Sequence, residues 1–179
     1  TTTAVDIGCH YGFFTRFLSE QFKTVHAFDF NNDIFECFKE NMKKFKCENV
    51  IAYPHGLGEK QKYVATNDWS ERHKRRGPLA NHIDPDGKKQ LQKIKTLDSF
   101  NLEGVGLIMC DTEGYELNVI KGALQTIKKC KPVLVLEFHN RKLTKKFGYT
   151  LKHLQDYVES LGYRSIGYMN KVDQIFVPE

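Results

Sequence analysis

The repeated change from a short apolar run to a helical pattern is the feature that most constrains the fold of this chain. The apolar runs occupy residues 4–7, 25–28, 50–53, 105–110 and 132–138. They do not alternate with polar residues, which is typical of strands that are buried on both faces of a parallel sheet. Segments 13–22 and 33–45 space their apolar residues three and four positions apart, as amphipathic helices do. This order predicts an α/β fold, with a mainly parallel sheet and helices on both of its faces.

The remaining segments complete this prediction and leave one exception. Helices are expected over 114–128 and 151–161, a short strand over 62–65, and a C-terminal hairpin from strands at 163–169 and 174–177. Residues 67–93 are polar and without a period, so we expect a flexible loop on the substrate side of a site. No repeat or linker divides the chain, which predicts a single domain over 1–179. Because the chain enters a strand almost at Thr1, we expect that a preceding helix is missing from this sequence.

Composition narrows the classes of function. Lys and Arg total 27 against 22 Asp and Glu, and the net charge of +5 is compatible with an anionic partner without requiring one. The apolar runs are too short to span a membrane. The five cysteines are scattered and lack the spacing of a zinc or redox motif. We therefore expect free thiols, no metal site and a reducing, cytoplasmic location.

The residues that follow the apolar runs are the candidate site. In an open parallel sheet, ligands bind beyond the carboxyl ends of the strands. Each patch in these places contains acidic, glycine or histidine residues, a combination that favours a binding site over plain connections. The patches are residues 6–12, 29–32, 55–58, 111–116 and 137–140.

The first two patches indicate a nucleoside-type ligand. Gly8 permits a tight turn, and the helix after it offers free N–H groups. A dinucleotide fingerprint would need glycines where His10 and Phe13 stand, and Asp6 suits a cationic or hydroxyl-bearing ligand better than a pyrophosphate. Asp29 can accept hydrogen bonds from both hydroxyls of a ribose. A mere strand–helix turn and a helix cap at Asp29 are the alternatives.

Several motifs together resemble the FkbM family of S-adenosylmethionine-dependent methyltransferases, from about residue 4 to residue 140. The glycine turn is generic, whereas the Asp-x-Glu-Gly-x-Glu segment followed by Lys-Gly-Ala is specific. The matching segments are Val5-Asp6-Ile7-Gly8 with Gly12 and Thr15, Ala27-Phe28-Asp29, Thr96-Leu97-Asp98, Asp111-Thr112-Glu113-Gly114-Tyr115-Glu116 and Ile120-Lys121-Gly122-Ala123.

The resemblance implies a Rossmann-like class I methyltransferase fold with a seven-stranded sheet and S-adenosyl-L-methionine as the cofactor. It also implies O-methylation of a sugar, a glycan or a small natural product. The residues expected to bind the cofactor are Asp6, Gly8, Cys9, His10, Gly12, Asp29, Phe30, Gly56 and Asp111. The family usually has Asn and Pro where His10 and Phe30 stand, so the contacts of these two residues stay open.

Four residues are candidates for the chemistry of methyl transfer. Asp111 is expected beside the sulfonium or the acceptor, and Glu113 is expected to orient or deprotonate the acceptor hydroxyl. Capping of the following helix by Glu113 and Glu116 is the alternative. Glu137 ends the most hydrophobic run, where desolvation raises the pKa of a carboxyl group. His139 titrates near neutrality and is a candidate general base.

The acceptor is expected to be a hydroxyl-bearing carbohydrate or small molecule, and nucleic acid is disfavoured. The basic run at 72–76 beside Trp69 is either a solvated loop or a collar for an anionic acceptor. The rival function is a nucleic-acid or glycan binding module on a degenerate methyltransferase fold, with residues 67–93 as its contact surface.

Overall fold

The computed structural model describes residues 2–65, 91–138 and 141–179. The predicted flexible loop at 67–93 lies outside these ranges, except for its last three residues. Residues 91–93 belong to a strand, so the prediction of a loop is wrong for them. Within the described ranges, no helix is long and apolar enough to cross a membrane.

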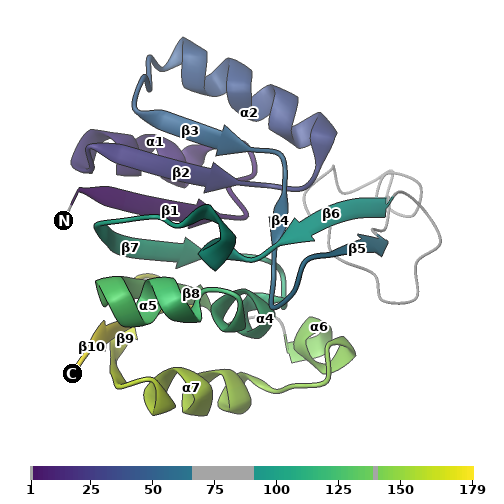
Figure 1. The fold of residues 1–179 in the computed structure, drawn as a ribbon, viewed down its shortest axis with the longest axis vertical. Helices are drawn as coiled ribbons and strands as arrows, with labels where there is room; N and C mark the ends of the chain where they lie inside the picture. Colours follow the sequence, from purple (N-terminus) through teal and green to yellow (C-terminus); the bar gives the residue numbers. More distant parts are fainter. Residues whose placement is uncertain (1, 66–90, 139–140) are drawn as a thin grey trace.

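The main sheet has seven strands in the order β3-β2-β1-β7-β8-β10-β9 (Figure 1). The strands are β1 (Thr3–Ile7), β2 (Thr24–Phe28), β3 (Val50–Tyr53), β7 (Val105–Cys110), β8 (Val133–Glu137), β9 (Tyr163–Tyr168) and β10 (Asp173–Pro178). The five strands from β3 to β8 pair in parallel, and β10 runs antiparallel to both β8 and β9. The predicted mainly parallel sheet with a C-terminal antiparallel hairpin is confirmed.

Helices cover both faces of this sheet, as predicted. They are α1 (Phe13–Gln21), α2 (Asn32–Lys44), α4 (Glu116–Lys121), α5 (Leu124–Cys130), α6 (Arg141–Lys146) and α7 (Leu151–Ser160). Neighbouring residues of a strand point to opposite faces. Accordingly, Ala27 packs with Phe38 of α2 in one apolar cluster, whereas Phe28 belongs to a larger cluster with Ile120 of α4 and Leu154 of α7.

The single helix predicted over 114–128 is wrong, because the chain forms α4 and α5 with a break at Gly122. The break follows from a tertiary contact with Asp98 of the short 3₁₀ helix η1 (Leu97–Phe100). The carboxylate of Asp98 accepts hydrogen bonds from the backbone N–H of Gln125 (3.0 Å) and of Thr126 (2.9 Å), and from the Thr126 hydroxyl (2.8 Å). These contacts satisfy N–H groups at the start of α5, so a new helix begins there.

Asp98→Ala is expected to lower the free energy of unfolding by about 2 kcal/mol, because the first turn of α5 loses its acceptor. Urea denaturation followed by circular dichroism measures the change. The matched control is Asp156→Ala, since Asp156 pairs only with the exposed Lys152 on the surface of α7 and should contribute little. Equal stability losses in the two variants would contradict the capping role of Asp98.

A second, smaller sheet was not predicted. It contains β4 (Gly56–Leu57), β6 (Leu91–Lys95) and β5 (Lys62–Ala65), in that order. The strand expected at 62–65 is therefore present, but it belongs to this sheet. Figure 1 shows the arrows of β1, β2 and β7 pointing toward the small sheet, which lies at the carboxyl end of the main sheet. The small sheet thus borders the edge where the ligand is expected.

Candidate functional site

A cavity of about 280 Å³ lies at the carboxyl edge of the main sheet. It is lined by the segments that follow β1, β2, β3 and β7, which are the places where the sequence analysis expected a site. Nine predicted site residues line this cavity: Asp6, Gly8, Cys9, His10, Asp29, Phe30, Gly56, Asp111 and Glu113. The fold therefore brings together residues that are separated by as many as a hundred positions in the chain.

The other predicted site residues do not line the cavity or lie outside the described ranges. Gly12 caps the start of α1 with a φ of 86°, and a side chain there would strike Met42 and Phe38, so its place is in the packing against α2. Glu137 does not line the cavity, but its carboxyl group is hydrogen-bonded to that of Asp111. His139 is outside the described residues, and its role as a base stays a prediction.

The Gly8 turn joins the ends of three strands. The backbone N–H groups of Gly8 and Cys9 both donate to the carbonyl of Phe28, at 2.9 and 3.1 Å. Gly8 has a φ of 84°, and a Cβ atom added to it would lie 1.8 Å from the carbonyl oxygen of Asp111. Only glycine fits this combination of a left-handed backbone and a close approach. The tight turn predicted at Gly8 is confirmed, and the missing side chain also allows contact between the β1 and β7 ends, which was not predicted.

The carboxylate of Asp29 is fixed by the backbone on both sides. One oxygen accepts the N–H of His10 at 3.0 Å and the other accepts the N–H of Asn31 at 2.9 Å. Burial raises the pKa of Asp29, and these hydrogen bonds act in the opposite direction. Each oxygen retains a lone pair, so the side chain can also accept two hydroxyl groups from a ligand in the cavity.

Asp6 is held by the first helix. The hydroxyl of the buried Thr15 donates a hydrogen bond to the Asp6 carboxylate. Burial raises the pKa of Asp6 to about 6, and the nearby charge of Asp29 adds to the shift. The contact explains why Thr15 accompanies the glycine turn: it orients Asp6 at the floor of the cavity.

The loop after β7 is fixed by Glu116, which is fully buried. One oxygen of Glu116 accepts hydrogen bonds from the backbone N–H of Thr112 and of Gly114 and from the Thr112 hydroxyl, each at 3.0 Å. The hydroxyl of Tyr149 donates to the carbonyl of Gly114 at 2.6 Å and lies 3.1 Å from the other Glu116 oxygen. Glu116 and Tyr149 together hold the loop that carries Asp111, and no pattern in the sequence indicates the Tyr149 contact.

Asp111 and Glu137 form a hydrogen-bonded carboxyl pair at neighbouring strand ends. Burial raises the pKa of Asp111 well above its usual range, and both the charge of Glu137 and the hydrogen bond to it raise it further. Burial and the charges of Glu113 and Glu116 also raise the pKa of Glu137, as the sequence predicted, whereas the hydrogen bond with Asp111 lowers it. The pair therefore keeps a proton at a higher pH than an ordinary carboxyl group does.

An apolar wall of the cavity was only partly predicted from the sequence. Its members are Tyr11, Phe13, Phe14, Phe28, Ile34, Leu57, Ile94, Met109 and Tyr115. Tyr11, Leu57 and Tyr115 belong to the predicted patches, whereas Phe13 and Phe14 were placed only in an amphipathic helix, and 72% and 41% of their surfaces are exposed. Their position in the first helical turn after the glycine motif was the signal that they face the site.

The family model described as "Methyltransferase FkbM domain" matches residues 6–165. No curated protein sequence matches the chain in a direct comparison.

Solved structures share this fold at low sequence identity. Methyltransferase FkbM from Methylobacillus flagellatus aligns with a TM-score of 0.70 at 18% identity, over 98% of this chain and 43% of that one. An rRNA methylase from Streptococcus thermophilus aligns with a TM-score of 0.57 at 15% identity, over 98% and 84%. A protein from Streptococcus mutans, solved in complex with SAH, aligns with a TM-score of 0.57 at 14% identity, over 98% and 86%. The chain thus spans less than half the length of the Methylobacillus protein, and the likeness to all three is one of fold.

Proposed function

The chain belongs to the FkbM methyltransferase family, and from this premise we propose that it binds S-adenosyl-L-methionine and transfers the methyl group to a hydroxyl of a sugar, glycan or small natural product. The observation that carries the proposal is the cavity in which the Gly8 turn, Asp29 and Asp111 meet. Its volume of about 280 Å³ is near the lower end of the range for small-molecule sites.

The groups around the cavity fit this cofactor chemically. Asp29 can accept the two ribose hydroxyls, and Phe30 and Ile94 offer apolar surface to an adenine ring. Asp6, whose pKa is raised less than that of Asp111, supplies a carboxylate that suits a positively charged sulfur. When bound, the cofactor supplies a methyl group on a sulfonium. Orientation of the acceptor and removal of its proton are left to the protein.

The hydroxyl group that is methylated must give its proton to a base, and the carboxyl pair of Asp111 and Glu137 can serve as this base. Asp111 lines the cavity, whereas Glu137 does not line it and is hydrogen-bonded to Asp111. In the proposed step, the acceptor hydroxyl gives its proton to Asp111 while Asp111 passes its own proton to Glu137. Asp111 and Glu137 would thereby leave the acceptor oxygen free to take the methyl group that the bound cofactor would supply. A base of this kind contributes roughly 10²–10⁴-fold to a rate.

Glu113 is the proposed orienting group. It lines the cavity next to Asp111 and has a φ of 54°. A non-glycine residue in this left-handed region is uncommon and is held there by its surroundings. The Glu116 and Tyr149 contacts that fix the neighbouring Gly114 supply this constraint.

Asp29→Ala is expected to weaken binding of S-adenosyl-L-methionine by about tenfold or more, because the ribose hydroxyls lose a charged acceptor. Isothermal titration calorimetry on the folded variant measures the Kd. Asp29→Asn keeps one acceptor oxygen and should lose less affinity. Unchanged affinity in Asp29→Ala would remove the ribose assignment.

The rival reading, a binding module on a degenerate fold, is tested on the unmodified protein. A ligand that binds only the native state raises the melting temperature. The proposal expects stabilisation by S-adenosyl-L-methionine and by S-adenosylhomocysteine, whereas the rival expects none from either compound.

We further propose a reducing, cytoplasmic location. All five cysteines are free, and burial raises the pKa of the Cys9 and Cys110 thiols. Buried neutral thiols of this kind are inert and typical of proteins from reducing compartments.

A further inference from the structure

A basic surface borders the cavity on the side of the small sheet. Lys93 and Lys95 lie two positions apart on β6, so they share one face of the sheet. Tyr63 of β5 pairs directly opposite Lys93 and is 66% exposed. His55 follows β3 and lines the cavity. These four residues, here called the basic strip, connect the outer face of the small sheet to the site.

His55 lies beside the two lysines, because it directly precedes β4, whose Gly56 and Leu57 pair with Ile94 and Lys95 of β6. Burial lowers the pKa of His55, and the charges of Lys95 and Lys93 lower it further. The Nδ1 atom of His55 is buried and has no hydrogen-bond partner among the described residues. A polar atom in this position, beside two cations, is ready for a ligand group that accepts hydrogen bonds and carries negative charge.

The lysines of the basic strip are not neutralised by the part of the chain that the structure describes. Neither Lys93 nor Lys95 forms an ion pair there, and the Nζ atom of Lys95 lies 5.2 Å from the centre of the Phe100 ring. In contrast, Lys129 at the other end of the molecule pairs with Glu103 at 2.7 Å. Positive charge is therefore available next to a cavity whose floor is acidic.

We propose that the methyl acceptor carries an anionic group, a phosphate or a carboxylate, which the basic strip binds. This inference rests on the proposed methyltransferase function. The acidic residues of the cavity favour the cationic sulfonium, whereas the basic strip favours an anionic acceptor. Charge would thus direct each of the two substrates to its own part of the site. The exposed ring of Tyr63 beside Lys93 offers a flat surface for a sugar ring. The substrate class is thus a small anionic compound with a free hydroxyl, such as a sugar phosphate or a uronic acid.

The test compares three matched probes in the presence of saturating S-adenosylhomocysteine. They are glucose with a phosphate on its primary hydroxyl, glucuronate and neutral glucose. Calorimetry measures binding, and the NMR signal of the His55 imidazole follows its titration. We expect at least one anion to bind and to raise the pKa of His55, and we expect glucose to do neither. Binding of one anion and not the other identifies the phosphate or the carboxylate as the recognised group.

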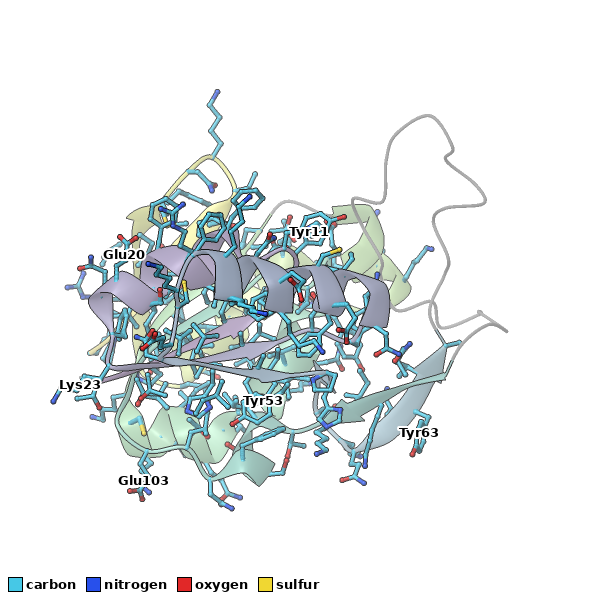
Figure 2. The ribbon with its side chains drawn as sticks, turned by 90° about the horizontal axis from the view of Figure 1, so that it is seen from above. Tyr11, Glu20, Lys23, Tyr53, Tyr63 and Glu103 are labelled. Atoms are coloured by element: carbon cyan, nitrogen blue, oxygen red, sulfur yellow. The ribbon has the colours of Figure 1, made fainter. Side chains whose placement is uncertain are left out.

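The double variant Lys93→Gln, Lys95→Gln is expected to bind the anion about tenfold more weakly or worse. Lys23→Gln removes a charge at the opposite end of the molecule from Tyr63, as Figure 2 shows, and is the control that should bind normally. S-adenosylhomocysteine should bind the double variant with unchanged affinity, because neither lysine lines the cavity.

Any of three results with the sugar probes would overturn the proposal. They are equal binding of glucose and the anions, normal anion binding by the double variant, and no binding of either anion to the unmodified protein at millimolar concentration. Binding of a single-stranded RNA oligonucleotide at the same lysines, without binding of the sugars, would also overturn it in favour of a nucleic acid. Failure of the unmodified protein to bind S-adenosylhomocysteine is a separate result, which counts against the methyltransferase function itself.

Discussion

Gly8→Val is expected to abolish binding of S-adenosyl-L-methionine and to lower the free energy of unfolding by roughly 3 kcal/mol or more. A Cβ atom at Gly8 would lie 1.8 Å from the carbonyl oxygen of Asp111, so the β1 and β7 ends must separate. The same movement shifts Asp111 and the Cys9 N–H group, and a β-branched side chain also resists a φ of 84°. Calorimetry and urea denaturation measure the two losses.

Gly162→Val is the matched control for this change. Gly162 has a φ of 81°, close to that of Gly8, but an added Cβ atom there would meet nothing within 4 Å. The control therefore carries the backbone strain, about 1–2 kcal/mol, without the clash. It should bind the cofactor normally. Equal losses of stability in Gly8→Val and Gly162→Val, with normal cofactor binding by both, would contradict a role of the close approach to Asp111 in cofactor binding.

Asp111→Asn is expected to lower turnover roughly a hundredfold or more, because the amide cannot take the hydroxyl proton. Glu137→Gln should have an effect of similar size, since Asp111 then has no carboxylate to receive its own proton. The pH–rate profile of the unmodified enzyme should rise above the ordinary carboxyl range, because burial raises the pKa of both groups. Glu103→Gln is the control with normal turnover, because Glu103 does not line the cavity and lies far from Tyr11 of its lining in Figure 2.

The Asp111→Asn variant can also be tested without a methyl acceptor, through the pH dependence of its stability. A carboxyl group with a raised folded pKa stabilises the native state below its unfolded pKa of about 4, and this stability is lost as the pH rises through the folded pKa. The unmodified protein should therefore lose stability between these two values. Asp111→Asn should lose less over the same interval in urea denaturation. A pH dependence that is unchanged in the variant would contradict the proton shared by Asp111 and Glu137.

The large elements of the fold could be predicted because the spacing of their apolar residues follows from which of their positions are buried. The run at 105–110 coincides with β7, and the hairpin was placed within one or two residues. The failures have tertiary causes. The helix predicted over 114–128 is divided because Asp98 accepts a hydrogen bond from Gln125, 27 residues later in the sequence. β4 is two residues long and shows no pattern of its own, and α6 lacks the apolar stripe of an amphipathic helix.

The site was predictable where a residue lies directly after a strand, because the topology alone brings those positions to one edge. Asp29 and Asp111 were found in this way, and both line the cavity. The contacts that tune the site were not predictable. Tyr149 meets Glu116 from 33 residues away, and the proton shared by Asp111 and Glu137 depends on the distance between two side chains. His55 was predicted only as part of the patch at 55–58. Its proposed role depends on two lysines of the small sheet, which was not predicted.

The position of β10 between β8 and β9 has a consequence for how the protein is made. β9 is synthesised before β10, yet β10 is its neighbour in the sheet, so β9 stays unpaired while β10 is still inside the ribosome. Domains begin to fold from the N-terminus during synthesis, and an unpaired strand edge invites aggregation. Asp173 of β10 pairs with Glu137, so this last strand also completes the surroundings of the carboxyl pair. The surroundings of the carboxyl pair should thus be completed only once β10 has left the ribosome, in the same step that pairs the exposed edge of β9.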